Sequence, residues 1–228
     1  YFRTEYWYQY RTSNSYSLNM IKVAITDDHP LLLEGLKNIL GNSDTIDVVD
    51  CFKNVSEMNA GLAKQTIDIL LLDINLVDTN SIELIKPLKK KYNNLQIIIL
   101  SVHNELPVIN SSLAEGASGY IQKNASVSEI LEGISSVYDG KQFLCSQTKS
   151  VLEKKSADGL NQVPKLTRRE KEILGEAAKG LTTNQMAEKL FISPHTVESH
   201  RKNLIEKFQT SNLSSAIKLA IEYGLIIE

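Results

Sequence analysis

Cysteine is scarce in this chain, which excludes the usual cysteine-rich scaffolds. Cys51 and Cys145 are its only cysteines among 228 residues, and they match no metal-binding spacing. They indicate a reducing compartment rather than a disulfide framework. Apolar runs are short, and none approaches the ~18 residues that a membrane helix needs. No GxxxxGK[ST] phosphate loop occurs, which argues against an NTPase. These absences favour a cytoplasmic protein that contacts no membrane.

Charge is divided unevenly along the chain, although the net charge is only −2. Residues 20–145 hold 10 Lys and Arg against 16 Asp and Glu, a balance of −6, whereas residues 163–228 hold 10 against 8, a balance of +2. A chain of this length has room for two domains that each bury a core. An acidic front and a mildly basic back predict two domains with different partners.

Two segments lie outside these domains. Residues 1–19 are rich in Tyr and lack aliphatic periodicity, so we interpret them as an extension that takes no part in the fold. A docking segment is the alternative. Residues 146–162 are polar, contain Ser, Lys and Gly, and are interpreted as a linker. The predicted domains therefore span residues 20–145 and 163–228.

The front domain alternates short apolar runs with helical patterns. The run Ile69–Leu72 is apolar throughout, which is typical of a strand buried on both faces. The expected strands are 21–26, 46–51, 68–72, 95–100 and 118–121, and the expected helices are 30–40, 55–63, 82–92, 105–115 and 127–138. Five consecutive strand–helix units predict an α/β, flavodoxin-like fold, with a doubly wound five-stranded parallel sheet of strand order 2-1-3-4-5.

Polar residues stand at the carboxyl ends of these strands, where open parallel sheets bind ligands. The strand-end residues are Asp27, Asp28, Asp73, Ser101 and Lys123. Taken alone, Asp73 would as readily cap the next turn. Carboxylates that converge on one crevice normally hold a cation, and oxygen ligands favour Mg²⁺. A hydroxyl and a Lys ammonium beside them suit phosphate oxygens.

Residues 21–139 resemble the receiver domain of bacterial two-component response regulators. The resemblance is carried by Asp27-Asp28, Asp73, Ser101 and the stretch EGASGYIQK at 115–123. It implies that Asp73 accepts a phosphoryl group from the phosphohistidine of a sensor histidine kinase. Haloacid-dehalogenase-type phosphatases also combine Asp, Ser and Lys. They place the nucleophile after the first strand in a DxDGT-like run, which the sequence DDHP at 27–30 is not.

The same resemblance assigns roles to the other strand-end residues. The implied magnesium ligands are Asp28 and Asp73 directly, Asp27 through water, and the carbonyl of Asn75. The implied phosphoryl contacts are Ser101 and Lys123, with Tyr120 changing rotamer as the phosphoryl group binds. Without the resemblance, Tyr120 would be interpreted as a half-buried strand aromatic. Leu76-Val77 replaces the Met-Pro pair that is usual in the family, which leaves the loop after Asp73 less restrained.

The back domain has a helical pattern from Val163 onward, with three breaks that divide it into four helices. The expected N-caps include Thr167, Ser193 and Ser214. Pro194 directly after Ser193 strengthens the start signal of the third helix. Two helices joined by a short turn, the second amphipathic and basic, predict an all-α helix-turn-helix domain.

Residues 166–208 resemble the LuxR-type helix-turn-helix of NarL/FixJ-type regulators, through LTRRE, GLTTNQMA and HTVESHRKNL. The residues implied near DNA phosphates are Thr196, Arg201 and Lys207. Those implied at base edges are Glu198, Ser199 and Lys202, and a Glu there accepts from a cytosine amino group. The implied dimer contact on the last helix consists of Ala216, Ile217, Ala220 and Ile221. A protein-binding bundle with a solvated basic face is the alternative.

Together the two resemblances imply a transcriptional regulator whose dimerisation and binding to double-stranded DNA are switched by phosphorylation. They imply a homodimer in the active state and no enzymatic turnover beyond slow self-dephosphorylation. By family analogy, the receiver masks the recognition helix until Asp73 is phosphorylated. The rivals are a constitutive DNA-binding protein with a vestigial receiver, and a phosphatase with an Asp nucleophile.

Overall fold

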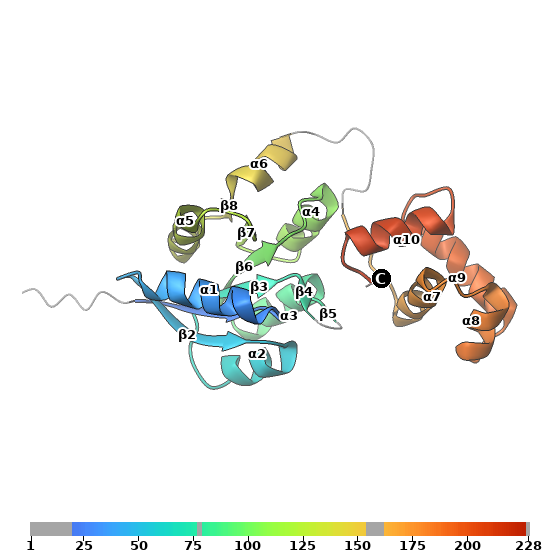
Figure 1. The fold of residues 1–228 in the computed structure, drawn as a ribbon, viewed down its shortest axis with the longest axis horizontal. Coiled ribbons are helices and arrows are strands. Elements are labelled where there is room, and N and C mark those ends of the chain that lie inside the picture. Colours follow the sequence, from blue (N-terminus) through green and yellow to red (C-terminus); the bar gives the residue numbers. More distant parts are fainter. Residues whose placement is uncertain (1–19, 77–78, 154–161, 227–228) are drawn as a thin grey trace, which may run out of the picture.

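The computed structural model describes residues 20–76, 79–153 and 162–226, which form two domains (Figure 1). The predicted extension 1–19 and residues 154–161 of the predicted linker lie outside the described residues. Among the helices of the described part, none is long and apolar enough to cross a membrane.

The N-terminal domain is built on a parallel sheet of order β2-β1-β3-β6-β7-β8. Its strands are β1 Ile21–Thr26, β2 Ile46–Phe52, β3 Ile69–Asp73, β6 Gln96–Ser101, β7 Gly119–Gln122 and β8 Phe143–Leu144. The first five in this order are the five predicted strands, so the predicted order is confirmed. The predicted strand count is wrong, because the two-residue strand β8 pairs with β7 at the sheet edge. So short a strand carries no periodicity that the sequence could display.

Helices cover both faces of this sheet. They are α1 Pro30–Gly41, α2 Val55–Leu62, α3 Ile82–Lys91, α4 Leu106–Ala114 and α5 Val127–Tyr138. Ile69 and Leu71 of β3 pack in one apolar cluster with buried residues of α1 and α5. Leu70 and Leu72 pack in the other cluster with buried residues of α2, α3 and α4. Burial on both faces explains why β3 is apolar without alternation.

The loop after β3 forms a small hairpin. Strands β4 Asn75–Leu76 and β5 Thr79–Asn80 pair antiparallel, with Asn75 opposite Asn80. Leu76, which with Val77 replaces the Met-Pro pair usual in the family, therefore lies in β4. Val77 lies outside the described residues.

The predicted linker is wrong at its start. Helix α6 Ser146–Glu153 follows β8 directly and packs against α4 and β7. The buried thiol of Cys145 accepts a hydrogen bond from the backbone N–H of Gln122 at 3.4 Å and lies 3.2 Å from the hydroxyl of Thr148. Glu129 accepts from the backbone N–H of Ser146 at 2.8 Å. Tertiary packing thus fixes a segment whose polar composition indicated a linker.

The C-terminal domain has the four predicted helices: α7 Arg168–Ala178, α8 Thr183–Lys189, α9 Pro194–Lys207 and α10 Leu213–Glu222. The predicted caps Thr167 and Ser193 are confirmed, since each side chain accepts from the backbone N–H three residues on. Ser214 is not a cap. Asn212 caps α10 instead, accepting from the N–H of Ser215 at 2.8 Å.

The N-terminal domain contacts the C-terminal domain through α3 and α4. The contacting parts of the C-terminal domain are residues 162–171 and the residues just after α10. Ser111 accepts from the N–H of Val163 at 2.7 Å, Lys165 pairs with Glu115 at 2.5 Å, and Lys171 pairs with Glu83 at 2.7 Å. Between the domains lies a pocket of about 290 Å³ whose lining includes Ile82, Leu166 and Leu225. Figure 1 shows α8 and α9 on the side of the C-terminal domain that faces away from the sheet.

Candidate functional site

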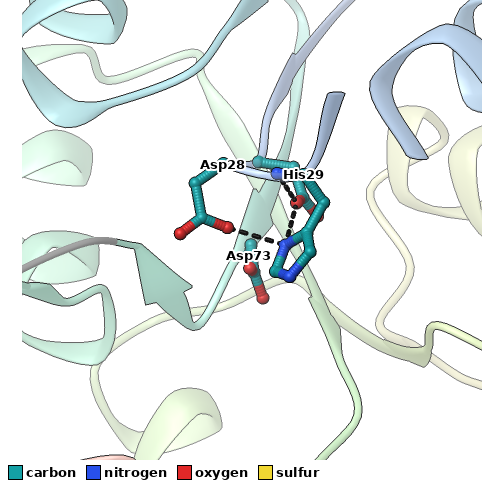
Figure 2. A group of neighbouring side chains, drawn as sticks. Asp28, His29 and Asp73 are labelled. Carbon is teal, nitrogen blue, oxygen red and sulfur yellow. Dashed lines mark hydrogen bonds and ion pairs between the residues drawn. The ribbon is translucent and has the colours of Figure 1, made fainter. Parts of the chain in front are cut away.

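The carboxyl ends of β1 and β3 bring three aspartates together. The two strands pair in parallel, with Thr26 beside Leu72, so the residues that follow meet at one edge. Asp27 and Asp73 are buried, at 0% and 3% exposure. Figure 2 shows Asp28, His29 and Asp73 converging, with the imidazole of His29 bridging two carboxylates. Its Nδ1 lies 2.7 Å from Asp28 and 3.0 Å from Asp27.

Lys123 reaches into this cluster from the end of β7, as its position predicted. Its ammonium lies 2.7 Å from Asp27 Oδ2 and 2.9 Å from Asp73 Oδ2. Burial alone would lower the pKa of Lys123, but its contacts with Asp27 and Asp73 outweigh that effect and raise it. Burial raises the pKa of Asp73 to about 6, although Lys123 acts in the opposite direction. Asp73 is thus a buried, poorly solvated carboxylate beside a fixed positive charge.

The cluster has the donor set of a hard-cation site. One ligand atom from each of Asp27, Asp28, His29 and Asp73 lies within 4.8 Å of the others. Within the described residues, Asp27 Oδ2, Asp28 Oδ1 and Asp73 Oδ2 are buried without a well-directed hydrogen bond, despite their ion-pair distances to Lys123 or His29. Buried anionic oxygens of this kind fit Mg²⁺. His29 was not predicted; its adjacency to the acidic pair was the available signal.

Ser101, the last residue of β6, and Tyr120 of β7 share a partner, His103. The buried Ser101 hydroxyl accepts from the N–H of His103 at 2.9 Å, and the Tyr120 hydroxyl donates to the carbonyl of His103 at 2.9 Å. Tyr120 is fully buried rather than half-buried, and burial strongly raises the pKa of its phenol. The imidazole of His103 also bonds the side chain of Asn75 at 2.7 Å. No sequence signal indicated His103.

The predicted DNA face lies on α9, and part of it is solvent-exposed. Glu198, Ser199 and Lys202 are exposed, whereas Thr196 and Arg201 are half-buried. The hydroxyl of Ser199 donates to the carbonyl of His195 on its own helix at 3.0 Å. The expectation of a masked recognition helix is therefore wrong for this structure, because the N-terminal domain contacts the start of α7 and the residues that follow α10 instead.

Two further predicted sets need correction. Lys207, expected near phosphate, donates to the carbonyl of Lys165 at 3.0 Å and pairs with the buried Glu170 at 2.7 Å. In the predicted dimer contact, Ala216 and Ala220 are fully buried inside their own domain. Small apolar residues at helical spacing indicate a packing face but not its partner, and here the partner is intramolecular. Ile217 and Ile221 stay half-exposed.

Comparison with known proteins agrees with both domains. The family model "Response regulator receiver domain" matches residues 23–135, and "Bacterial regulatory proteins, luxR family" matches residues 164–220. The transcriptional regulatory protein LnrK of Bacillus subtilis is 30% identical, covering 91% of this chain and 100% of that protein. The transcriptional regulatory protein UhpA of Escherichia coli is 33% identical, covering 85% and 94%. This chain belongs to the NarL/FixJ family of response regulators.

The solved structures extend this family likeness to both domains together. The response regulator RcsB of Salmonella enterica serovar Typhimurium, solved bound to the promoter rprA, is 26% identical with a TM-score of 0.60, covering 88% of this chain and 99% of that one. The response regulator ChrA is 30% identical with a TM-score of 0.52, covering 91% and 100%. This response regulator therefore combines a receiver with a LuxR-type DNA-binding domain, and is a transcriptional regulator.

The ion pair between Lys207 and Glu170 can be tested by its effect on stability. Burial opposes ionisation of Glu170, but hydrogen bonds from Lys207 and Thr167 hold its pKa below the usual range. Lys207→Met should leave the buried carboxylate short of a partner and destabilise the C-terminal domain by about 1–2 kcal/mol, less than for a fully buried pair because Lys207 is partly exposed. Urea unfolding of the full chain measures this.

The matched control is the exposed Lys202. Lys202→Met removes an exposed charge from the same helix and should leave unfolding unchanged. A Lys207→Met variant that keeps its stability and reduces the salt dependence of DNA binding by about one unit of slope would return Lys207 to the phosphate contacts.

Proposed function

We propose that this regulator is switched by phosphorylation of Asp73, with a sensor histidine kinase as donor and Mg²⁺ as cofactor. The observation that carries the proposal is the position of the Lys123 ammonium, 2.7 and 2.9 Å from the carboxylates of Asp27 and Asp73. In the transfer, an Asp73 oxygen bonds to phosphorus while the phosphorus–nitrogen bond of the phosphohistidine breaks. The electron pair stays on the leaving imidazole.

The residues around Asp73 have separable tasks in this step. Lys123 neutralises charge on the phosphoryl oxygens, and the Ser101 hydroxyl donates to one of them after transfer. Asp28, Asp73 and the Asn75 carbonyl would hold Mg²⁺ directly and Asp27 would hold it through water, and the bound ion would further neutralise those oxygens. The chemistry is a stoichiometric switch, so we propose no enzymatic role beyond slow self-dephosphorylation, and we place the protein in the cytoplasm.

We further propose that His103 connects the phosphorylation site to the C-terminal domain. It contacts Ser101 and Tyr120 through its backbone and Asn75 through its ring. Asn75 in turn abuts Gly224, just after α10, where an added β-carbon would overlap the Asn75 side-chain oxygen. When Ser101 turns to the phosphoryl group, this chain of contacts rearranges and releases the end of α10.

Release has two consequences in this proposal. The C-terminal domain separates from the receiver, and Ile217 and Ile221 form the contact of a homodimer on double-stranded DNA. Two domains then occupy half-sites about one helical turn apart. Phosphorylation acts by freeing α10 rather than by uncovering α9.

Genome-wide footprinting with and without acetyl phosphate tests the function. We expect protected sites with the phosphodonor and few without it. The exposed α9 face favours one rival, a constitutive DNA-binding protein with a vestigial receiver. Equal protection in both conditions would support that rival.

A further inference from the structure

We propose that Thr183 is a positioning residue for DNA specificity, which together with Arg201 holds Glu198 so that it selects cytosine in each half-site. The proposal rests on the proposed DNA-binding function and assigns a role to a residue outside the recognition helix. It also changes the role of Arg201 from a phosphate contact alone to part of a base-selecting cluster.

The three side chains form a closed ring between the two helices of the motif. Thr183 is the first residue of α8, and Glu198 and Arg201 lie one turn apart on α9. The Thr183 hydroxyl donates to Glu198 Oε1 at 2.5 Å. Arg201 Nη1 donates to the same Oε1 at 3.1 Å and also to the hydroxyl oxygen of Thr183. Each member therefore restrains the other two.

The ring leaves Oε2 of Glu198 available to accept a hydrogen bond. Both hydrogen bonds fall on Oε1, and among the described residues Oε2 has no hydrogen-bond partner. Arg201 compensates the negative charge of a side chain that would otherwise be repelled by DNA phosphates. Its guanidinium keeps further N–H groups for a phosphate. A Glu is thereby tolerated on a surface that binds a polyanion.

An acceptor with no donor of its own distinguishes the four bases. In the major groove, guanine presents only acceptors, and thymine presents an acceptor and a methyl group. Adenine presents an amino group beside the N7 acceptor, which repels a carboxylate. Cytosine presents an amino donor without that acceptor. A fixed Glu198 should therefore prefer cytosine.

The Thr183 hydroxyl is needed because Glu198 is otherwise poorly restrained. More than half of its side chain is exposed, at 57%, and among the described residues its other hydrogen-bond partner is the half-buried Arg201. Without the hydroxyl, the carboxylate samples several rotamers, and its preference among bases weakens.

Selection of duplexes from a randomised library by the full-length protein, with acetyl phosphate and Mg²⁺, tests the proposal. For the wild type we expect one cytosine position per half-site, preferred by about tenfold. Thr183→Val preserves the side-chain shape and should reduce that preference to about twofold, with the other positions unchanged. Glu198→Gln should change the preference to adenine, because Gln pairs with its N6 and N7.

Glu206→Gln is the matched control, since it removes one exposed carboxylate from the same helix; it should select as the wild type does. Thermal unfolding confirms that each variant is folded. A Thr183→Val profile identical to wild type overturns the role of Thr183. Glu198→Gln overturns cytosine selection if it still prefers cytosine, or if it only tightens binding to every duplex. A wild type that selects no duplex contradicts the DNA-binding function itself.

Discussion

Asp73→Asn should reduce phosphorylation by acetyl phosphate and Mg²⁺ to background. The amide has no anionic oxygen to attack phosphorus, and it also removes one of the carboxylates that suit the cation. Intact-mass spectrometry of the full-length protein after incubation with the phosphodonor measures the effect. Because nearly all phosphoryl transfer depends on this one nucleophile, the expected loss is larger than for any other substitution near the site.

Loss of the fold would not explain this result. Asp73 has a folded pKa of about 6, above its ordinary value of 3.8, so its ionised form costs stability at neutral pH. The neutral Asn removes that cost, and the variant should unfold at the same or a higher urea concentration. Asp44→Asn, at an exposed loop residue, is the control and should be phosphorylated normally. Phosphate incorporation by Asp73→Asn at the wild-type rate would show that another residue is the acceptor.

Gly224→Ala should separate the domains and increase DNA binding in the absence of a phosphodonor by about tenfold or more. Gly224 has a φ of +65°, and a β-carbon added there would overlap Asn75 Oδ1. A methyl group therefore adds both backbone strain and overlap with the Asn75 side chain. Fluorescence anisotropy with an operator duplex measures the affinity, and small-angle X-ray scattering measures the expected increase in radius of gyration.

Gly140→Ala isolates the contact from the strain. Gly140 has a similar φ of +79°, but an added β-carbon there would meet nothing within 4 Å. This variant should lose a comparable amount of backbone stability and keep the wild-type dependence on phosphodonor. If Gly224→Ala binds DNA no more tightly than Gly140→Ala, then the contact with Asn75 does not restrain the C-terminal domain.

The sequence predicted the parallel sheet and much of the site around Asp73, because both depend on local patterns. Alternating apolar runs and helices specify strand order through parallel crossovers, and parallel strands bring their carboxyl ends to one edge. The sequence therefore predicts that Asp27, Asp73, Ser101 and Lys123 lie at the same edge of the sheet. The capping boxes of the C-terminal domain are equally local.

What the sequence did not predict depends on distant contacts. Asn212 and Ser214 are both residue types that cap helices well. The chain turns at Gln209, which has a φ of +52°, before α10 begins, and Asn212 is the residue that caps this helix. Lys207 belongs to a basic helix, but its partner Glu170 lies 37 positions away. The position of His103 between Ser101 and Asn75 likewise depends on how two loops fold together.

The two edges of the sheet limit how copies of the receiver can associate. An unpaired edge strand is a template for another chain unless it is short, charged or covered. At one edge β8 offers only two residues before α6 begins. At the other edge β2 carries the exposed carboxylate of Asp47. Strand addition between molecules is therefore disfavoured at both edges of the sheet, which protects the protein from edge-to-edge aggregation. Self-association is then expected to use helical surfaces.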